Sequence, residues 1–336
     1  MTGHFSFRNS NSIGRYEQFR TVYSYIFRSR EEMYHITDLH IHLGGSWPLS
    51  YLKSVASPDE MEELDAFLDE IDNATTTYSS CFIAFALASK IINSNQRVEE
   101  GVAVLCKDLV AQKVTYVELR TGLKQYGSDT YEDYLQAILR GIERSNCPNL
   151  TIKLLLSLKR TSTPEFAAET LRLLLKYRHV VVGIDISDHS VLGDGTGIDS
   201  IIDDLHRERI PIALHLGECI EETEAQQIKE LTRYQPARIG HGVFLSAAAK
   251  EYIYSRRLPI EMCISSSVKA RMIKTANQHP GLELLLNSYP VAICTDDPLV
   301  FRIDHISENK RVQELLGYSD AQMEEVHRKA LDYAFV

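Results

Sequence analysis

The sequence predicts an α/β fold, a (β/α)8 TIM barrel, and three observations carry this prediction. The chain has 336 residues, 44% of them hydrophobic, which is enough for one large buried core. Short apolar or β-branched segments alternate with amphipathic stretches, as expected for a parallel sheet with crossover helices. Eight strand segments can be counted. They lie at 35–43, 114–120, 152–158, 180–186, 211–216, 237–242, 258–264 and 291–296.

The connections between these strands carry helical patterns. In 97–112, apolar residues recur at positions that line one helix face. The connection at about 47–113 is unusually long, and we expect a helical insertion there, with an acidic solvated helix and a lid near the site. Since no repeat or Pro/Gly-rich hinge divides the rest, we expect 35–336 to form a single domain.

Residues 1–34 precede the first strand and are rich in Arg, Ser, Asn and aromatic residues. Three roles stay open for this N-terminal arm: a packed arm, a contact surface or a translocation signal. The arm lacks the continuous apolar stretch of a secretory signal, and no apolar run in the chain is long enough to cross a bilayer. We therefore expect no membrane insertion.

Charge and cysteine content limit the partners. A net charge of −10 argues against a surface that neutralises nucleic-acid phosphates, so we expect a small-molecule substrate and no nucleic acid. Six cysteines are scattered without any C-x-x-C pair, which is typical of reduced thiols and predicts a cytoplasmic location. The sequence leaves the oligomeric state open.

The first strand contains His40 and His42, two residues apart and therefore on the same strand face. Two such imidazoles can share a metal, and histidine is a common zinc ligand. Taken alone, the pair is as well explained by two polar residues on a solvent face. Its position favours a metal, because the pair lies at the carboxyl end of the strand, where barrel enzymes place catalytic groups.

Three other strand ends carry groups of the same kind: His215 with Glu218, His241, and Asp296 with Asp297. Individually, His241 is also explained as a core histidine and Asp-Asp-Pro as a turn. Because the carboxyl ends of all barrel strands meet at one face, their joint placement predicts a metal site with catalytic groups around it.

The ordered motifs HIHLGGS, YVELR, HLGE, RIGHG, EMCISSS and TDDP resemble those of the adenosine deaminase family, from about His35 to Pro298. The resemblance implies a barrel of the metal-dependent hydrolase type with one zinc ion per chain. Its ligands would be the residues at four motif positions: His40, His42, His215 and Asp296. Glu218, His241 and Asp297 would act on the base and the attacking water.

The resemblance implies hydrolytic deamination of an adenine nucleoside, nucleotide or related 6-aminopurine to the 6-oxo purine and ammonia. Zinc lowers the pKa of water that it binds, and hydroxide can attack C6 of the ring. Glu218 would protonate N1, His241 would hold and deprotonate the water, and Asp297 would orient the ring near N7. No P-C-x-x-C motif is present, and the fourth strand has no lysine for a two-metal site.

Two positions depart from the family pattern. Gly44 stands where relatives have Asp or Asn, so a ribose contact is lost and a phosphate or another 5′ group can be admitted. Asp188 stands where the family has a glycine near the purine edge, which it would crowd or recharge. The alternative is a shifted loop in which Gly193 or Gly195 takes over.

Two other functions remain open. One is a zinc-barrel hydrolase of a different purine or a free base, which the departures permit. The other is a substrate-binding or signalling protein without turnover that engages a partner through 1–34 or 47–113. The complete set of catalytic residues favours an enzyme, because a barrel without turnover has no chemical need of Glu218 and His241.

Overall fold

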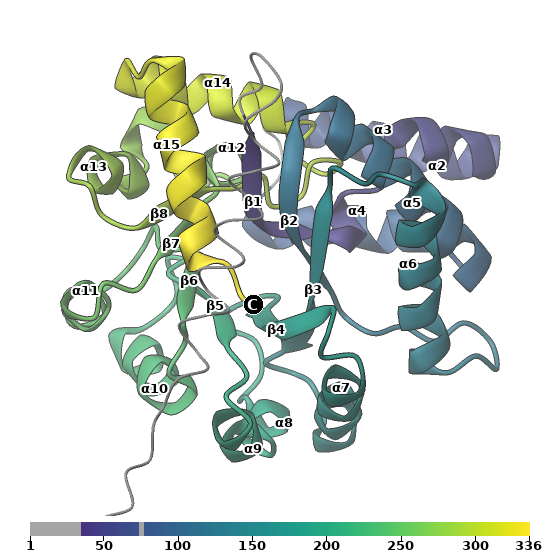
Figure 1. Cartoon of the computed structure of the whole chain (residues 1–336), viewed down its shortest axis with the longest axis horizontal. Coiled ribbons are helices and arrows are strands. Elements are labelled where there is room, and N and C mark those ends of the chain that lie inside the picture. Colours follow the sequence, from purple (N-terminus) through teal and green to yellow (C-terminus); the bar gives the residue numbers. More distant parts are fainter. Residues whose placement is uncertain (1–34, 74–76) are drawn as a thin grey trace, which may run out of the picture. The chain divides into compact units, whose positions relative to one another are not determined.

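Eight parallel strands follow one another around a barrel in the computed structural model, which describes residues 35–73 and 77–336 (Figure 1). The strands are β1 (Ile36–His42), β2 (Val114–Thr121), β3 (Thr151–Lys159), β4 (Val181–Ser187), β5 (Ile212–Leu216), β6 (Arg238–His241), β7 (Ile260–Met262) and β8 (Val291–Ile293). Each strand pairs with its neighbours in sequence. A bridge between Ile41 and Asp296 brings the segment after β8 against β1. The predicted (β/α)8 barrel is confirmed.

Helices cover the outside of the barrel, and several begin at a Ser or Thr that accepts a hydrogen bond from the first turn, as the sequence favours. After the insertion they are α6 (Tyr131–Ser145), α7 (Pro164–Lys176), α8 (Thr196–Asp199), α9 (Ile202–Arg207), α10 (Glu224–Tyr234), α11 (Ala247–Ser255), α12 (Ile264–Lys269), α13 (Pro280–Leu286), α14 (His305–Leu316) and α15 (Asp320–Ala330).

The long connection between β1 and β2 is helical. It contains a short turn η1 (Leu43–Gly45) and the helices α2 (Leu49–Val55), α3 (Pro58–Asp72), α4 (Tyr78–Ile91) and α5 (Asn95–Ala111). The acidic helix α3 buries only one stripe, which comprises Leu64, Leu68 and Ile71. Helix α4 packs against both α3 and η1, so the insertion reaches the carboxyl end of β1.

The last strands are shorter than the sequence predicts. The seventh ends at Met262 rather than at 264, because α12 begins at Ile264. The eighth ends at Ile293 rather than at 296, and Asp296 has a φ of 64°. His241, the last residue of β6, has a φ of 63°. Left-handed backbone does not continue a strand, so β6 ends at His241 and Asp296 lies outside β8.

The amino end of the barrel is filled by the end of the chain, which Figure 1 shows at the centre of the ring of strands. Phe335 packs against Leu155, Val182 and Ala213. The guanidinium carbon of Arg238 lies 3.6 Å from the centre of the Phe335 ring, a cation–π contact. This end is therefore a packed core.

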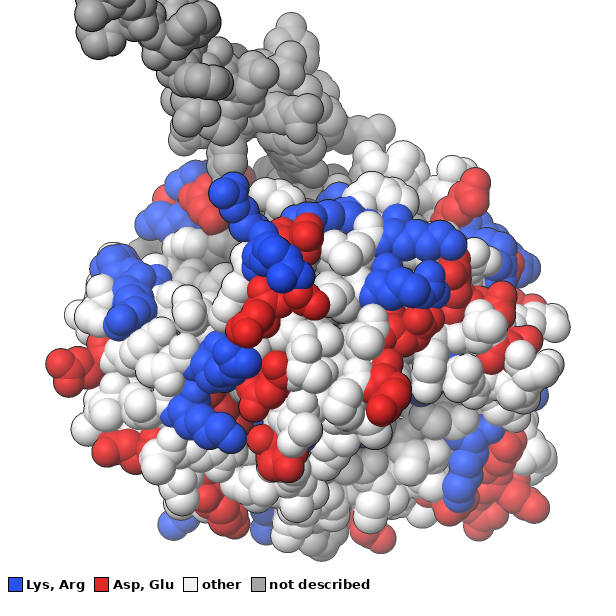
Figure 2. All heavy atoms as spheres, turned by 90° about the horizontal axis from the view of Figure 1, so that it is seen from below, with Lys and Arg blue, Asp and Glu red and all other residues white. Residues whose placement is uncertain are grey.

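The predicted arm at 1–34 lies outside the described residues. Residues His35 to Val336 form one compact unit. None of the helices that the structure describes is long and apolar enough to span a membrane. On the face that Figure 2 shows, basic and acidic side chains of the described residues are interspersed. The six cysteines are free thiols.

Candidate active site

Four side chains converge at the carboxyl end of the barrel. The Nε2 atom of His42 lies 3.2 Å from the Nε2 atoms of both His40 and His215. A carboxylate oxygen of Asp296 lies 3.4 Å from Nε2 of His40 and 3.6 Å from Nε2 of His42. Ligands of a tetrahedral zinc at about 2.0–2.1 Å are roughly 3.3 Å apart, so one metal ion fits between these four atoms.

Two buried carboxylates orient the ligand imidazoles. Glu261 contacts Nδ1 of His40 at 2.8 Å, and Asp185 contacts Nδ1 of His215 at 3.2 Å. A carboxylate at Nδ1 favours the tautomer whose proton is on Nδ1, which leaves the Nε2 lone pair facing the centre of the cluster. These carboxylates therefore prepare both imidazoles to bind a metal.

Arg120 joins the two orienting carboxylates. Its guanidinium donates to Asp185 at 2.8 Å and to Glu261 at 2.5 Å, and all three side chains are fully buried. Burial alone would raise the pKa of both carboxyl groups, but the Arg120 charge acts together with the other neighbouring cationic and hydrogen-bonding side chains and holds both pKa values well below their usual range. Sequence reasoning gave these residues no role. The available signal was a charged residue inside each apolar strand, which implies a buried partner.

Glu218 and His241 lie beside this cluster of four side chains. Nε2 of His241 is 3.5 Å from a Glu218 oxygen, and neither ring nitrogen of His241 has a hydrogen-bond partner among the described residues. Burial holds the pKa of His241 well below its usual value, whereas burial and the Asp296 charge raise that of Glu218 well above it. At neutral pH the pair offers one proton donor and one proton acceptor.

Asp297 fills the space beside the Gly44–Gly45 turn. A Cβ atom at Gly45 would lie 1.9 Å from Oδ1 of Asp297, so only glycine fits there. That oxygen is buried and has no partner within 35–73 and 77–336. An unpaired buried polar atom costs about 1–3 kcal/mol, so its presence beside the histidine cluster suggests a place for a ligand. Burial and the adjacent Asp296 raise the pKa of Asp297 well above its usual value.

The two departing positions have ordinary surroundings. A Cβ atom at Gly44 would lie 3.6 Å from the Phe85 ring, so the position is open enough for alanine. Asp188 itself has the left-handed backbone that glycine favours, with φ of 73°, and its carboxylate pairs with Lys159 at 2.9 Å. Gly193 packs on the backbone of Arg160, and Gly195 packs on the hydroxyl of Tyr234.

Helix α4 presents an aromatic face to this end of the barrel. Phe82 stacks on His189, which follows β4, with ring centres 5.8 Å apart, and Ser79 hydrogen-bonds the same imidazole at 3.0 Å. Burial and the Glu218 charge raise the pKa of Tyr78. The insertion therefore contacts the loop after β4 and lies close to Glu218.

A (β/α)8 barrel with three imidazoles, a carboxylate and a donor–acceptor pair at its carboxyl end defines an amidohydrolase-type enzyme. The family model of adenosine deaminase matches residues 36–336. The chain belongs to the adenosine deaminase family, as its motifs predict.

Individual relatives agree with this assignment. The adenosine deaminase-like protein of Drosophila pseudoobscura pseudoobscura is 27% identical over 310 residues, which cover 89% of this chain and 90% of the relative. The N6-methyl-AMP deaminase of Homo sapiens is 26% identical over 313 residues, covering 89% and 88%. The crystal structure of arabidopsis ADAL complexed with IMP matches with a TM-score of 0.81 at 26% identity, over 90% of this chain and 92% of that one.

Proposed function

We propose that the protein is a zinc-dependent hydrolytic deaminase of a 6-aminopurine nucleotide or nucleoside. The observation that carries this proposal is the convergence of three imidazole nitrogens and a carboxylate beside Glu218. The metal would be held by His40, His42, His215 and Asp296, a nitrogen-rich set that suits zinc. When bound, zinc supplies Lewis acidity and lowers the pKa of water toward neutrality.

Glu218 and His241 divide the proton transfers. Water adds to C6 of the purine, and neutral His241 accepts the proton that the water loses. Glu218, which burial keeps protonated, donates its proton to N1. His241 then gives its proton to the amino group, and the C6–N6 bond breaks to release ammonia. Glu218 takes up the proton of the C6 hydroxyl, so the 6-oxo purine remains and both side chains return to their starting states. Each group begins in the protonation state that its step requires.

Asp297 is proposed to orient the base. Its raised pKa keeps a proton on the carboxyl group, so it can donate a hydrogen bond to the N7 acceptor. Its Oδ1 atom lacks a partner among the described residues, and the absence of a side chain at Gly45 leaves the space that the carboxyl group occupies. A base bound there would satisfy this atom and be held with C6 at the metal site.

We propose a purine nucleoside 5′-monophosphate, with an amino or methylamino group at C6, as the preferred substrate. Relatives named N6-methyl-AMP deaminase and the arabidopsis complexes with IMP and GMP support this choice. Lys124 follows the carboxyl end of β2, and Lys159 is the last residue of β3. The Lys124 ammonium donates to Ser89 at 3.0 Å and has no carboxylate partner among the described residues, while burial lowers its pKa. Such a cation suits a phosphate.

The test measures release of ammonia or methylamine from AMP, N6-methyl-AMP, adenosine, 2′-deoxyadenosine and adenine by the zinc-loaded protein. We expect kcat/KM to be at least about tenfold higher for the monophosphates, because a phosphate–lysine contact contributes over 1 kcal/mol. Lys124→Met should remove this preference and leave adenosine turnover unchanged. The matched control is Lys153→Met, which replaces a partly buried lysine that donates to the His179 carbonyl. A fully zinc-loaded protein that releases neither amine would contradict the proposal.

A further inference from the structure

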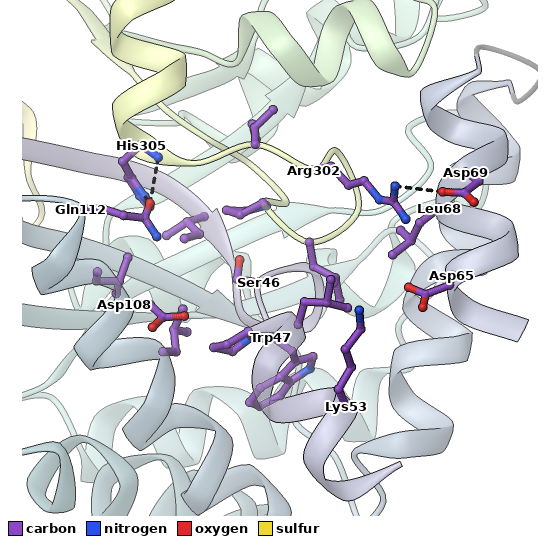
Figure 3. A pocket seen from close by; sticks show the side chains of 18 residues that line it. Ser46, Trp47, Lys53, Asp65, Leu68, Asp69, Asp108, Gln112, Arg302 and His305 are labelled. Atoms are coloured by element: carbon purple, nitrogen blue, oxygen red, sulfur yellow. Dashed lines mark hydrogen bonds and ion pairs between the residues drawn. The ribbon is translucent and has the colours of Figure 1, made fainter. Parts of the chain in front are cut away.

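A cavity lies outside the barrel wall, between α2, α3, α5 and the segment after β8 (Figure 3). Its volume is about 610 Å³, within the range of small-molecule sites. Ile41 contributes to its wall. Because Ile41 lies between His40 and His42 on β1, its side chain faces away from the metal ligands. The cavity is therefore separate from the metal site, although both use the same strand.

The charges around this cavity are incompletely paired. Arg302 is neutralised by Asp69 at 2.9 Å and Asp72 at 3.1 Å. The carboxylates of Asp65 and Asp108 have no hydrogen-bond or ion-pair partner within the described ranges. Figure 3 shows the ammonium of Lys53 on the side of Asp65, away from Asp108.

Of these two unpaired carboxylates, Asp108 is the one that lies away from Lys53 (Figure 3). It lies between Leu105 and Leu109, which line the same cavity. Burial raises its pKa, so a cation beside it would recover electrostatic energy that the carboxylate loses on burial.

Trp47 supplies a second recognition group. Its side chain is only 2% exposed, and the indole Nε1 has no hydrogen-bond partner in the described part of the chain. A Cβ atom at Gly101 would lie 2.8 Å from the indole, so the ring is packed tightly against α5. In Figure 3 the indole lies between Asp108 and Lys53. Trp47 and Asp108 both line the cavity, so an organic cation bound there can meet an aromatic ring and an unpaired carboxylate, by cation–π attraction and charge pairing.

We propose that this cavity binds a small organic cation, a protonated amine on an apolar or aromatic body, and that its occupancy alters catalysis. The η1 turn couples the two sites. Ser46, which lines the cavity, donates its hydroxyl to the His42 carbonyl at 2.6 Å. Leu299, which also lines it, donates its backbone N–H to the Gly45 carbonyl at 2.8 Å. Since Gly45 touches Asp297 without any gap, a shift of the turn moves a residue of the catalytic site.

Binding can be followed directly, because Trp47 is the only tryptophan of the chain. The full chain is titrated with 2-phenylethylamine, with 2-phenylethanol as the neutral analogue and 3-phenylpropionate as the anion. We expect a saturable change of tryptophan emission with the amine, an affinity at least about tenfold weaker for the alcohol, and no saturation with the anion. Equal responses to all three probes would overturn the proposal.

Two substitutions test the assigned carboxylate. Asp108→Asn should weaken amine binding at least about tenfold, because it removes the charge and keeps the shape. Glu62→Gln, on the exposed side of α3, should leave the affinity unchanged. Unchanged binding by Asp108→Asn would exclude this site.

The catalytic part is tested by deaminase assays with and without the amine. We expect a KM shift in the wild type and none in Asp108→Asn. Saturable binding without such a shift would overturn the coupling through η1. The fluorescence titration measures amine binding without requiring deaminase activity. A failure of the binding proposal can therefore be distinguished from a failure of the proposed deaminase function.

Discussion

At the amino end of the barrel the buried charges pair with one another, whereas at the carboxyl end buried polar atoms lie without partners. Arg238 donates to Glu118 and to Glu261 beneath the Phe335 ring. At the other end, His241 and Asp297 retain buried nitrogen and oxygen atoms that no described residue satisfies. Since unpaired groups cost stability, the comparison indicates that the amino end maintains the fold and the carboxyl end is prepared for ligands.

Glu261 connects the two ends. One of its oxygens accepts from Arg238 at 2.7 Å, and the other contacts the His40 imidazole at 2.8 Å and Arg120 at 2.5 Å. Substitutions at the amino end should therefore lower stability, and substitutions at the carboxyl end should lower catalytic activity. A substitution of Glu261 should lower both.

The largest expected effect is that of Glu218→Gln on turnover. Loss of the proton donor should lower kcat by about 10²–10⁴-fold, the usual contribution of general acid catalysis. Zinc content, measured by elemental analysis, should be unchanged, and the thermal midpoint should not fall, because the replaced carboxyl group supports no core pairing. Near-normal turnover by this variant would remove Glu218 from the mechanism.

Glu261→Gln should affect both regions. Breaking a buried ion pair costs about 3–5 kcal/mol, because Arg120 and Arg238 are left undercompensated. Loss of the carboxylate behind His40 should also weaken zinc binding by about 10–100-fold. Denaturant unfolding and competition with a chelator measure the two effects, and a variant that lost only one of them would contradict the bridging role.

Phe335→Ala should destabilise the protein by about 3 kcal/mol and leave kcat nearly unchanged. The change removes a buried ring and its cation–π contact at the amino end, far from the reacting groups. Urea unfolding gives the first quantity, and steady-state kinetics on the folded fraction gives the second. A comparable fall in kcat would show that the two ends are not separable.

The smallest effect is a loss of stability in acid through His279, a buried histidine in neither region. Burial lowers its pKa to about 3, below the unfolded value of about 6.5. The unfolded chain binds the proton more readily between these values, so stability is complete above pH 6.5 and decreases as pH falls toward 3.

At pH 5 this loss should be about 2 kcal/mol. His279 accepts a hydrogen bond from the Gly281 amide, and His279→Asn keeps such a cap without the titrating ring. Urea unfolding at pH 7 and pH 5 should show a smaller difference for the variant than for the wild type. An equal difference would assign the acid sensitivity to other groups.

The sequence predicts the barrel well because apolar strand segments recur with helical stretches between them. It also places His40, His42, His215 and Asp296 at strand ends, and the carboxyl ends of a barrel must meet. Their roles as ligands remain a proposal, although the structure brings the four atoms together.

Other features were not predictable because they depend on partners far apart in sequence. Arg120 can form ion pairs with Asp185 and Glu261 only when the strands have closed into a barrel. The pairing of Asp188 with Lys159 likewise depends on the register of β3 and β4. The seventh strand ends early because α12 begins at Ile264, and His241 and Asp296 have left-handed backbone, which hydrophobic periodicity does not predict.

Because Gly45 and Asp297 lie so close together, the residue allowed at one of these positions depends on the residue at the other, although the two are far apart in sequence. With no space for a methyl group between them, a side chain at position 45 requires a smaller residue at position 297. A Gly45→Ala background should therefore acquire second-site changes at 297, and each of these would remove the carboxyl group proposed to hold the base. Volume alone should therefore make glycine at position 45 a condition for keeping that carboxyl group in place.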